Sequence, residues 1–104
     1  MITKSVNGEN NTLTQDINLF EDITIQMRDT YERKNADYGN SFEEQYNEYG
    51  LISSCWRIED KLRRLKSLSK QEARVKDESI EDTLLDLANY SILTVMSIRK
   101  SCNK

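Results

Sequence analysis

The chain has 104 residues and a formal net charge of −3; 37% of its residues are hydrophobic and 32% are charged, and it contains no histidine, no proline and only three glycines. A chain of this length forms one domain with a modest core that gains from oligomerisation, and so few helix breakers favour an all-α fold. The absence of histidine excludes Ser–His and Cys–His catalysis and leaves too few ligands for structural zinc, so we expect Cys55 and Cys102 to be reduced, structural thiols.

The N-terminal region gives expectations about location. Residues 1–12 are polar and lack the apolar segment of a signal peptide, and the chain has no run of about 18 apolar residues. We therefore expect a cytoplasmic protein that makes no contact with a membrane. We also expect residues 1–12 to be a disordered tail and residues 13–104 to form a single domain.

The first expected helix covers about residues 13–34, and a short helix follows over residues 41–50. The buried stripe of the first helix is expected at positions with helical spacing, namely Phe20, Ile23, Met27 and Tyr31. In the short helix, Ser41 and Glu44 are spaced as a capping box and Gly50 is placed as the stop signal. The intervening residues 35–40 are expected to end the first helix.

Two further helices are expected, over about residues 53–68 and 79–99, separated by a charged connector. The inward positions of the earlier helix are predicted to be Cys55, Ile58, Leu62 and Leu65. Ser79 and Asp82 predict an N-terminal cap for the later helix. Its core side is predicted to comprise Ile80, Leu84, Leu87, Ser91, Val95 and Ile98. The pattern therefore predicts a compact helical bundle of three long helices and one short helix.

Charge is strongly segregated along the chain. Residues 1–50 carry four Lys/Arg against ten Asp/Glu, residues 51–76 carry eight against three, and residues 77–104 carry three against five. The basic middle is a candidate anion site framed by acidic helices. Because the whole chain is acidic, duplex nucleic acid is a poor partner, and a small phosphate-bearing ligand fits better.

Basic residues of the third helix share one face. Arg57, Lys61 and Arg64 follow 4,3 spacing, which places two guanidinium groups and an ammonium group where they suit phosphate oxygens. The alternative is a solvated basic face, or salt bridges to the acidic residues of the last helix.

The last helix carries polar residues opposite its predicted core side. Asp82, Asp86 and Asn89 follow 4,3 spacing, and the same face turns apolar at Leu93 and Met96, so it is expected to border an interface or a cleft. Two carboxylates in such a place suit a magnesium or phosphate site. Alternatively, Asp82 favours the helix N-terminus and Asp86 pairs with a basic neighbour.

The segment "KNADYGNSF" after the first helix combines unusual side chains for a loop. A cation, an amide, a carboxylate and an aromatic ring, those of Lys34, Asn35, Asp37 and Tyr38, can recognise the edges of a base or ribose and stack on a base. The alternative is a helix C-terminus in which Lys34 answers the helix dipole and Gly39 only supplies a turn.

Three stretches in this order, K-N-x-D-Y-G, "WRIEDKLRRLKSL" and "VKDESIEDTLLDLANYSIL", resemble the phage and bacterial "nucleotide modification associated" domain, which is related to MazG-like all-α NTP pyrophosphatases. The resemblance covers about residues 20–97. It implies a compact helical bundle that assembles as a dimer or higher oligomer and binds a nucleotide between its helices.

The resemblance also implies roles for acidic residues. MazG-like enzymes hold Mg²⁺ with E-E-x-x-E on one helix and E-E-x-x-D on another; Asp82 and Asp86 match the acidic positions of the second motif. Where the first would fall, the chain reads "WRIEDKL", with Glu59 and Asp60 acidic but Arg57 and Lys61 cationic. This departure removes metal ligands while adding cations that can contact phosphate directly.

Three hypotheses follow. In the first, the protein binds a nucleotide or nucleotide-derived signal without cutting it, gripping phosphate with the basic residues, as a phage protein could do against host defence. In the second, it is a Mg²⁺-dependent pyrophosphohydrolase in which Glu59, Asp82 and Asp86 hold the metal while Lys61 and Arg64 steady the phosphates. In the third, it is a helical bundle whose Leu93–Met96 face docks another protein.

Overall fold

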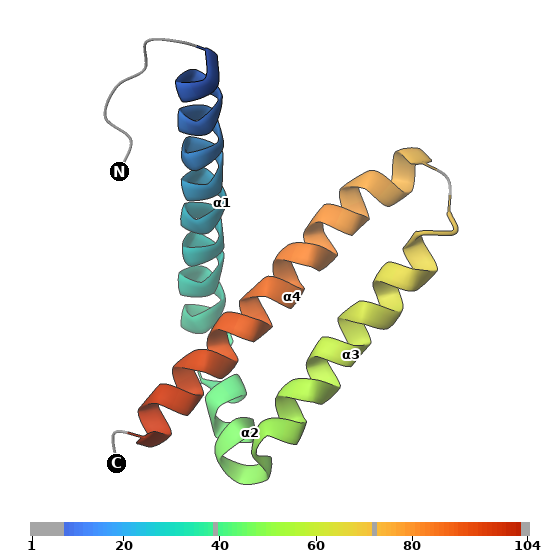
Figure 1. The fold of residues 1–104 in the computed structure, drawn as a ribbon. Helices are drawn as coiled ribbons and strands as arrows, with labels where there is room; N and C mark the ends of the chain where they lie inside the picture. The colour runs from blue at the N-terminus through green and yellow to red at the C-terminus, as the bar shows by residue number, and fades with distance from the viewer. Residues whose placement is uncertain (1–7, 39, 72, 103–104) are drawn as a thin grey trace. The chain divides into compact units, whose positions relative to one another are not determined.

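The computed structural model describes residues 8–38, 40–71 and 73–102, and of residues 8–10, 37–38 and 73–78 the backbone alone. This part of the chain forms helices and no strands, namely α1 (Gly8–Tyr38), α2 (Ser41–Tyr49), α3 (Leu51–Leu68) and α4 (Ala73–Cys102) (Figure 1). The predicted all-α fold is confirmed. No helix in the described ranges has the length and apolar character needed to cross a bilayer.

Two helices extend further than predicted. Helix α1 begins at Gly8 and continues through Tyr38, so residues 35–38 are helical; the segment contains no proline, and no glycine before position 39. Helix α4 begins at Ala73, so the predicted cap at Ser79 is wrong: Ser79 lies inside the helix, and its carbonyl accepts a 2.7 Å hydrogen bond from the Thr83 hydroxyl.

Helix α2 and its junction with α3 follow the prediction in part. Gly50 ends α2 with φ of 83°, its amide donates to the Tyr46 carbonyl at 2.7 Å, and α3 starts at the next residue. That φ favours glycine, so the predicted stop signal is confirmed. The capping box is wrong, because the N-cap residue is Asn40 and no side chain caps the helix.

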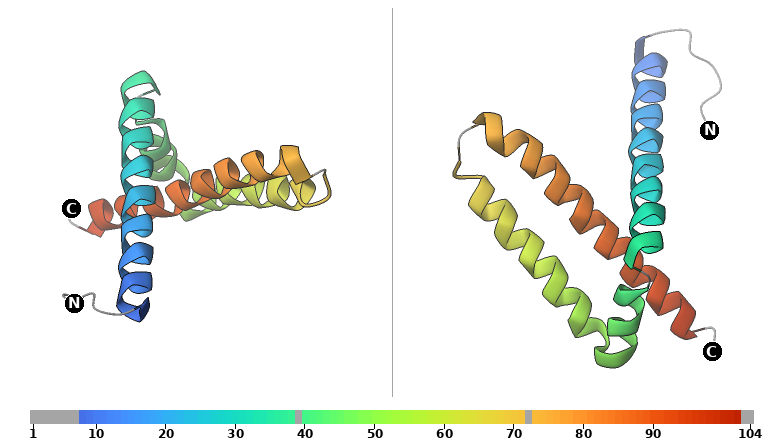
Figure 2. Two further views of the ribbon diagram at one scale, coloured as in Figure 1. Left: turned by 90° about the horizontal axis from the view of Figure 1, so that it is seen from above. Right: turned by 180° about the vertical axis from the view of Figure 1, so that it is seen from behind.

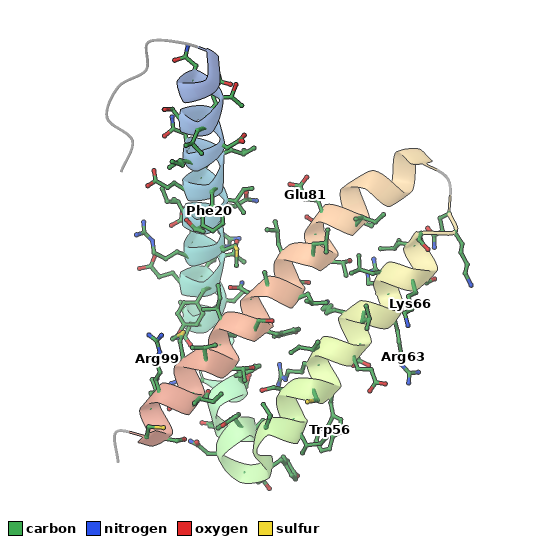
Figure 3. The ribbon with its side chains drawn as sticks, viewed as in Figure 1. Phe20, Trp56, Arg63, Lys66, Glu81 and Arg99 are labelled. Atoms are coloured by element: carbon green, nitrogen blue, oxygen red, sulfur yellow. The ribbon has the colours of Figure 1, made fainter. Side chains whose placement is uncertain are left out.

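Helix α1 belongs to a compact unit of its own, which ends at Asp37, and residues 38–104 form the second unit. The predicted buried stripe of α1 is only partly buried: Met27 is 8% exposed, but Phe20 is 70% and Ile23 39% exposed (Figure 3). Exposed Leu13 and Ile17 extend the stripe toward the N-terminus at heptad spacing. Much of the apolar face of α1 is therefore open.

In the second unit, α3 and α4 lie side by side and antiparallel, as Figures 1 and 2 show. The buried residues of this helical hairpin are mostly small and hydroxylated, namely Ser53, Ser54, Leu68, Thr83, Thr94 and Ser97. The Thr83 and Thr94 hydroxyls donate at 2.7 Å to carbonyls of their own helix. Small side chains that satisfy their polar atoms locally allow two helices to approach closely.

The predicted inward faces of α3 and α4 are wrong in part. Half-buried are Ile58, Leu65, Ile80 and Leu87, whereas the other predicted positions are exposed. Cys55 and Leu62 on α3 are exposed, as are Leu84, Val95 and Ile98 on α4. Both thiols are free, as expected, but Cys55 and Cys102 are exposed rather than part of a core. The sequence pattern favours the larger apolar stripe of each helix, whereas the two helices meet through their small hydroxylated residues.

At about 100° per residue, the exposed apolar stripe of each helix is rotated from the contact face in the same sense. In an antiparallel pair, stripes rotated in the same sense lie on the same side of the hairpin. We call this the apolar side, defined by Leu51, Cys55, Leu62, Leu84, Val95 and Ile98, all of them exposed.

Helix α2 covers the opposite side, which we call the α2 side. Phe42 of α2 stacks on Tyr90 of α4, and Glu43 pairs with Lys100 at 3.0 Å. Both α4 residues lie on the other flank of the contact face from the apolar stripe. Helix α2 therefore covers part of one side of the hairpin, whereas the described residues of the same unit leave the apolar side exposed.

Candidate functional site on the α2 side of the hairpin

Arg57 of α3 is held by three side chains from two other helices. Its Nε donates a 2.8 Å hydrogen bond to Oε1 of Gln45, and its guanidinium carbon lies 5.3 Å from the ring centre of Phe42 and 5.7 Å from that of Tyr90. The two rings are 6.0 Å apart and inclined by 13°. Aromatic faces and an amide thus orient a half-buried guanidinium, which retains its terminal N–H groups as donors for an anion.

Lys61 lies one turn further along α3 and pairs with α4. Its Nζ is 2.9 Å from Oδ2 of Asp86, and the two side chains are 26% and 32% exposed. The predicted alternative for Asp86, pairing with a basic neighbour, is therefore confirmed. The pair joins the two helices beside Arg57. Because the charges of Lys61 and Asp86 compensate each other, Arg57 contributes the net positive charge at this place.

The other predicted site residues on α3 and α4 are on the whole more exposed to solvent. Arg64 and Asp82 are exposed, and Asn89 is half-buried. Helical spacing places all of them on the α2 side, Arg64 on α3 and the other two on α4. The structure therefore gathers Arg57, Lys61, Arg64, Asp82, Asp86 and Asn89 along one side of the hairpin.

Glu59 lies elsewhere. Its carboxylate accepts a 3.1 Å hydrogen bond from Arg63, and both side chains are more than half exposed. Arg63 projects from α3 on the edge away from α4 (Figure 3), and Glu59, four residues earlier, shares that edge. Within one chain, Glu59 is therefore not brought to Asp82 and Asp86.

Asp82 and Asp86 are the carboxylates of the α2 side that the sequence suggested for Mg²⁺. Among the residues that the structure describes, no three His, Cys, Asp or Glu side chains gather where they could hold a metal ion. Asp86 is already bonded to Lys61, and Asp82 is exposed. A Mg²⁺ ion at Asp82 and Asp86 would have to displace the Lys61 ammonium from Asp86 and would take its remaining oxygen ligands from substrate or water.

The predicted base-recognition segment lies at the end of α1. Lys34 is exposed and Asn35 is half-buried in its last turns, in the unit that ends at Asp37. The side chains of Asp37 and Tyr38 lie outside what the structure describes.

Sequence reasoning missed Phe42, Gln45 and Tyr90 as parts of the site. Phe42 and Gln45 follow the segment "KNADYGNS" directly, and Tyr90 adjoins the predicted Asn89. Their proximity to predicted residues was a usable signal. What joins them to Arg57 is the packing of α2 across the hairpin, which no local pattern reports.

The face predicted to dock another protein is largely covered: Leu93 and Met96 are half-buried. Exposed aromatic residues lie instead at the α2–α3 junction, where the rings of Tyr49 and Trp56 are 5.7 Å apart. Trp56 projects from the edge of α3 that faces away from α4 (Figure 3).

Comparisons with known proteins give a family and no individual relative. Neither a curated protein nor a solved structure matches the chain. One family does match, over residues 34–98, which include α2, α3 and most of α4 and therefore every residue of the α2 side named above except Lys100. Because that match covers more than half of the chain, the protein belongs to the family described as nucleotide modification associated domain 1.

Proposed function

We propose that the protein binds a nucleotide through its phosphates on the α2 side of the hairpin. The observation that carries this proposal is the environment of Arg57, a half-buried guanidinium oriented by two aromatic rings and an amide. Held in this way, the side chain loses less conformational entropy when it binds a phosphate than a free arginine would. The family's association with nucleotide modification agrees with a phosphate-bearing ligand.

Two further residues of the α2 side can supply additional phosphate contacts. Arg64 adds an exposed cation two turns along α3, and Asn89 adds an amide from α4. For the base or ribose we propose the segment of Lys34, Asn35, Asp37 and Tyr38, since the family match begins at Lys34 and the segment thus belongs to the matched region. Cations for phosphate and an amide–aromatic set for the base are the usual division of labour in nucleotide recognition.

We further propose that the protein self-associates through its apolar side. Leu68 is the only buried hydrophobic side chain in the described part of residues 38–104, whereas Leu51, Leu84 and Val95 are about half exposed. So small a core is insufficient for a stable isolated domain of this size. The missing burial is best supplied by another chain.

A second copy is the occupant we propose for this side, because the chain carries both halves of a complementary interface. At about 100° per residue, the exposed Lys66 lies next to the apolar side on α3. Helix α1 presents an open apolar stripe, and its residues 8–38 carry three Lys/Arg against seven Asp/Glu. Apolar contacts with charges of opposite sign around them favour association of such surfaces.

Retention of an intact nucleotide is the activity we propose, with sequestration as its consequence. A Mg²⁺-dependent, MazG-like pyrophosphohydrolase is the second candidate, and its supporting observation is that Asp82 and Asp86 lie one turn apart on the α2 side. Retention has the stronger support because Asp86 is bonded to Lys61 and Glu59 to Arg63.

The experiment is an incubation of purified protein with a panel of linear and cyclic nucleotides, with Mg²⁺ or with EDTA. The mixture is filtered, the protein is denatured by heat, and both fractions are resolved by chromatography. Retention predicts that a nucleotide disappears from the filtrate and is recovered intact on heating. New products that depend on Mg²⁺ would instead establish the hydrolase, and an unchanged filtrate would reject both.

Arg57→Ala and Arg63→Ala form a matched pair for this experiment. Both substitutions remove an arginine from α3, but Arg63 projects on the edge away from α4 and contacts Glu59 (Figure 3). Loss of retention is expected for Arg57→Ala alone. Equal loss in both variants would mean that total charge, rather than the α2 side, holds the nucleotide.

A further inference from the structure

We infer that Lys61 takes the place of a divalent cation beside Asp86, so that the α2 side binds phosphate without a metal ion. The inference rests on the proposed nucleotide binding and specifies its charge chemistry. It starts from the 2.9 Å contact between the Lys61 ammonium and the Asp86 carboxylate.

The carboxylates near Lys61 are already engaged or exposed. A divalent metal at this place would need Asp86 and at least one further anionic oxygen from the protein or the ligand. Asp86 is engaged by an ammonium, Glu59 is bonded to Arg63 on another edge, and no three acidic side chains gather in the described part of the chain. Asp82, one turn before Asp86, is exposed, so the protein offers this position one exposed carboxylate beside one whose charge is already compensated.

The Lys61 ammonium repels any cation that approaches Asp86. Lys61 is anchored on α3, and its side chain is 26% exposed, so it cannot move far from Asp86 without losing its packing between the helices. A divalent cation at Asp86 would lie next to this ammonium and would be repelled by it. A lysine in this position opposes metal binding as long as its charge is present.

Lys61 and Arg57 together favour a bound phosphate. Compensation of Asp86 by Lys61 prevents the carboxylate from repelling an anion, and Arg57, oriented by Gln45, Phe42 and Tyr90, supplies donors to that anion. In a magnesium-dependent site, the metal ion supplies positive charge to the phosphate. Here, side chains of α3 supply that charge.

The test has a metal arm that needs no nucleotide. Binding of Mn²⁺ alone is measured by electron paramagnetic resonance for the wild type, Lys61→Gln, Lys61→Arg and the double variant Lys61→Gln/Asp86→Asn. We expect Lys61→Gln to bind Mn²⁺ roughly tenfold or more tightly than the wild type, because the repelling charge is gone. Lys61→Arg should behave as the wild type, and the double variant should lose the gain.

The phosphate arm uses inorganic triphosphate and the wild-type protein. Its affinity, measured by isothermal titration calorimetry, should change by no more than about twofold between EDTA and Mg²⁺, apart from the weakening caused by Mg²⁺ that binds triphosphate itself. Tighter binding of Mn²⁺ to the wild type than to Asp86→Asn, or binding of triphosphate that requires a metal, would overturn the inference.

The metal-binding and triphosphate-binding measurements distinguish failure of this inference from failure of the proposed phosphate binding. If the metal arm gives the expected order and triphosphate binds under neither condition, the proposed phosphate binding fails while the compensation of Asp86 by Lys61 stands. Helical content measured by circular dichroism checks that each variant folds. Should Lys61→Gln unfold, the wild-type comparison of EDTA with Mg²⁺ and the comparison with Asp86→Asn still decide the inference.

Discussion

The two sides of the α3–α4 hairpin differ in what covers them and in what they carry. On the α2 side, polar and aromatic side chains contact one another across three helices through Arg57, Gln45 and Glu43. On the apolar side, aliphatic residues such as Leu84 and Val95 are about half exposed, and the described part of residues 38–104 offers no element to cover them. Under the proposed function, one pair of helices separates a recognition surface from an assembly surface.

Substitution on the apolar side should have the largest effect. Leu84→Glu places a charge in the middle of this side, so we expect the dissociation constant of the self-assembly to rise by on the order of a hundredfold or more. Sedimentation equilibrium measures the change. Glu81→Gln, whose side chain projects from α4 away from α3 (Figure 3), is the control and should leave the assembly intact. A wild type that is monomeric at all concentrations would remove the role given to this side.

On the α2 side, the largest effect is expected for Arg57. Arg57→Ala removes the oriented guanidinium and should weaken nucleotide binding by about 2 kcal/mol, roughly thirtyfold, without altering the assembly. Titration calorimetry with a nucleotide identified in the panel gives the affinity, and Arg63→Ala is the matched control. If Arg57→Ala binds as the wild type does, Arg57 has only a structural role beneath α2.

The Lys61–Asp86 pair should make a smaller contribution, to stability. Lys61→Met breaks a contact that is only partly buried, so we expect a loss of about 1 kcal/mol in the free energy of unfolding. Urea denaturation at fixed protein concentration measures it, with Lys70→Met, an exposed lysine beyond the end of α3, as control. Equal stability of Lys61→Met and the wild type would show that the pair contributes nothing to holding α3 against α4.

The smallest effect is expected inside the hairpin. Ser54 is 1% exposed, and its hydroxyl has no hydrogen-bond partner among the residues that the structure describes. Ser54→Ala removes this polar atom and raises helix propensity, so the protein should gain about 0.5 kcal/mol in stability. Thermal unfolding followed by circular dichroism provides the measurement. A clear loss of stability would indicate that the hydroxyl has a partner in the folded assembly.

Local signals in the sequence were sufficient for some of the fold. Few helix breakers predicted the all-α class, and the glycine at position 50 predicted the end of α2. The phase of α3 and α4 could not be predicted from hydrophobicity, because each helix has a large apolar stripe and a smaller hydroxylated one. Periodicity favours the large stripe, whereas the helices meet through residues such as Ser54 and Thr83.

For the candidate site, spacing on one helix predicted which residues share a face. Arg57, Lys61 and Arg64 do lie on the α2 side. Contacts between helices were not accessible in this way: Phe42 and Tyr90 are far apart in the sequence and meet only because α2 crosses the hairpin. The same limit applies to Glu59, whose acidic character suggested a metal ligand but whose position on α3 turns it toward Arg63.

Sedimentation velocity with a nucleotide from the panel, followed at the absorbance of the base, tests the separation of the two sides most directly. For the wild type, we predict that the nucleotide moves with a boundary whose mass is a multiple of the single-chain mass. For Arg57→Ala, we predict a boundary of the same mass that carries no nucleotide. An Arg57→Ala boundary that carries as much nucleotide as the wild type would contradict the assignment of recognition to the α2 side.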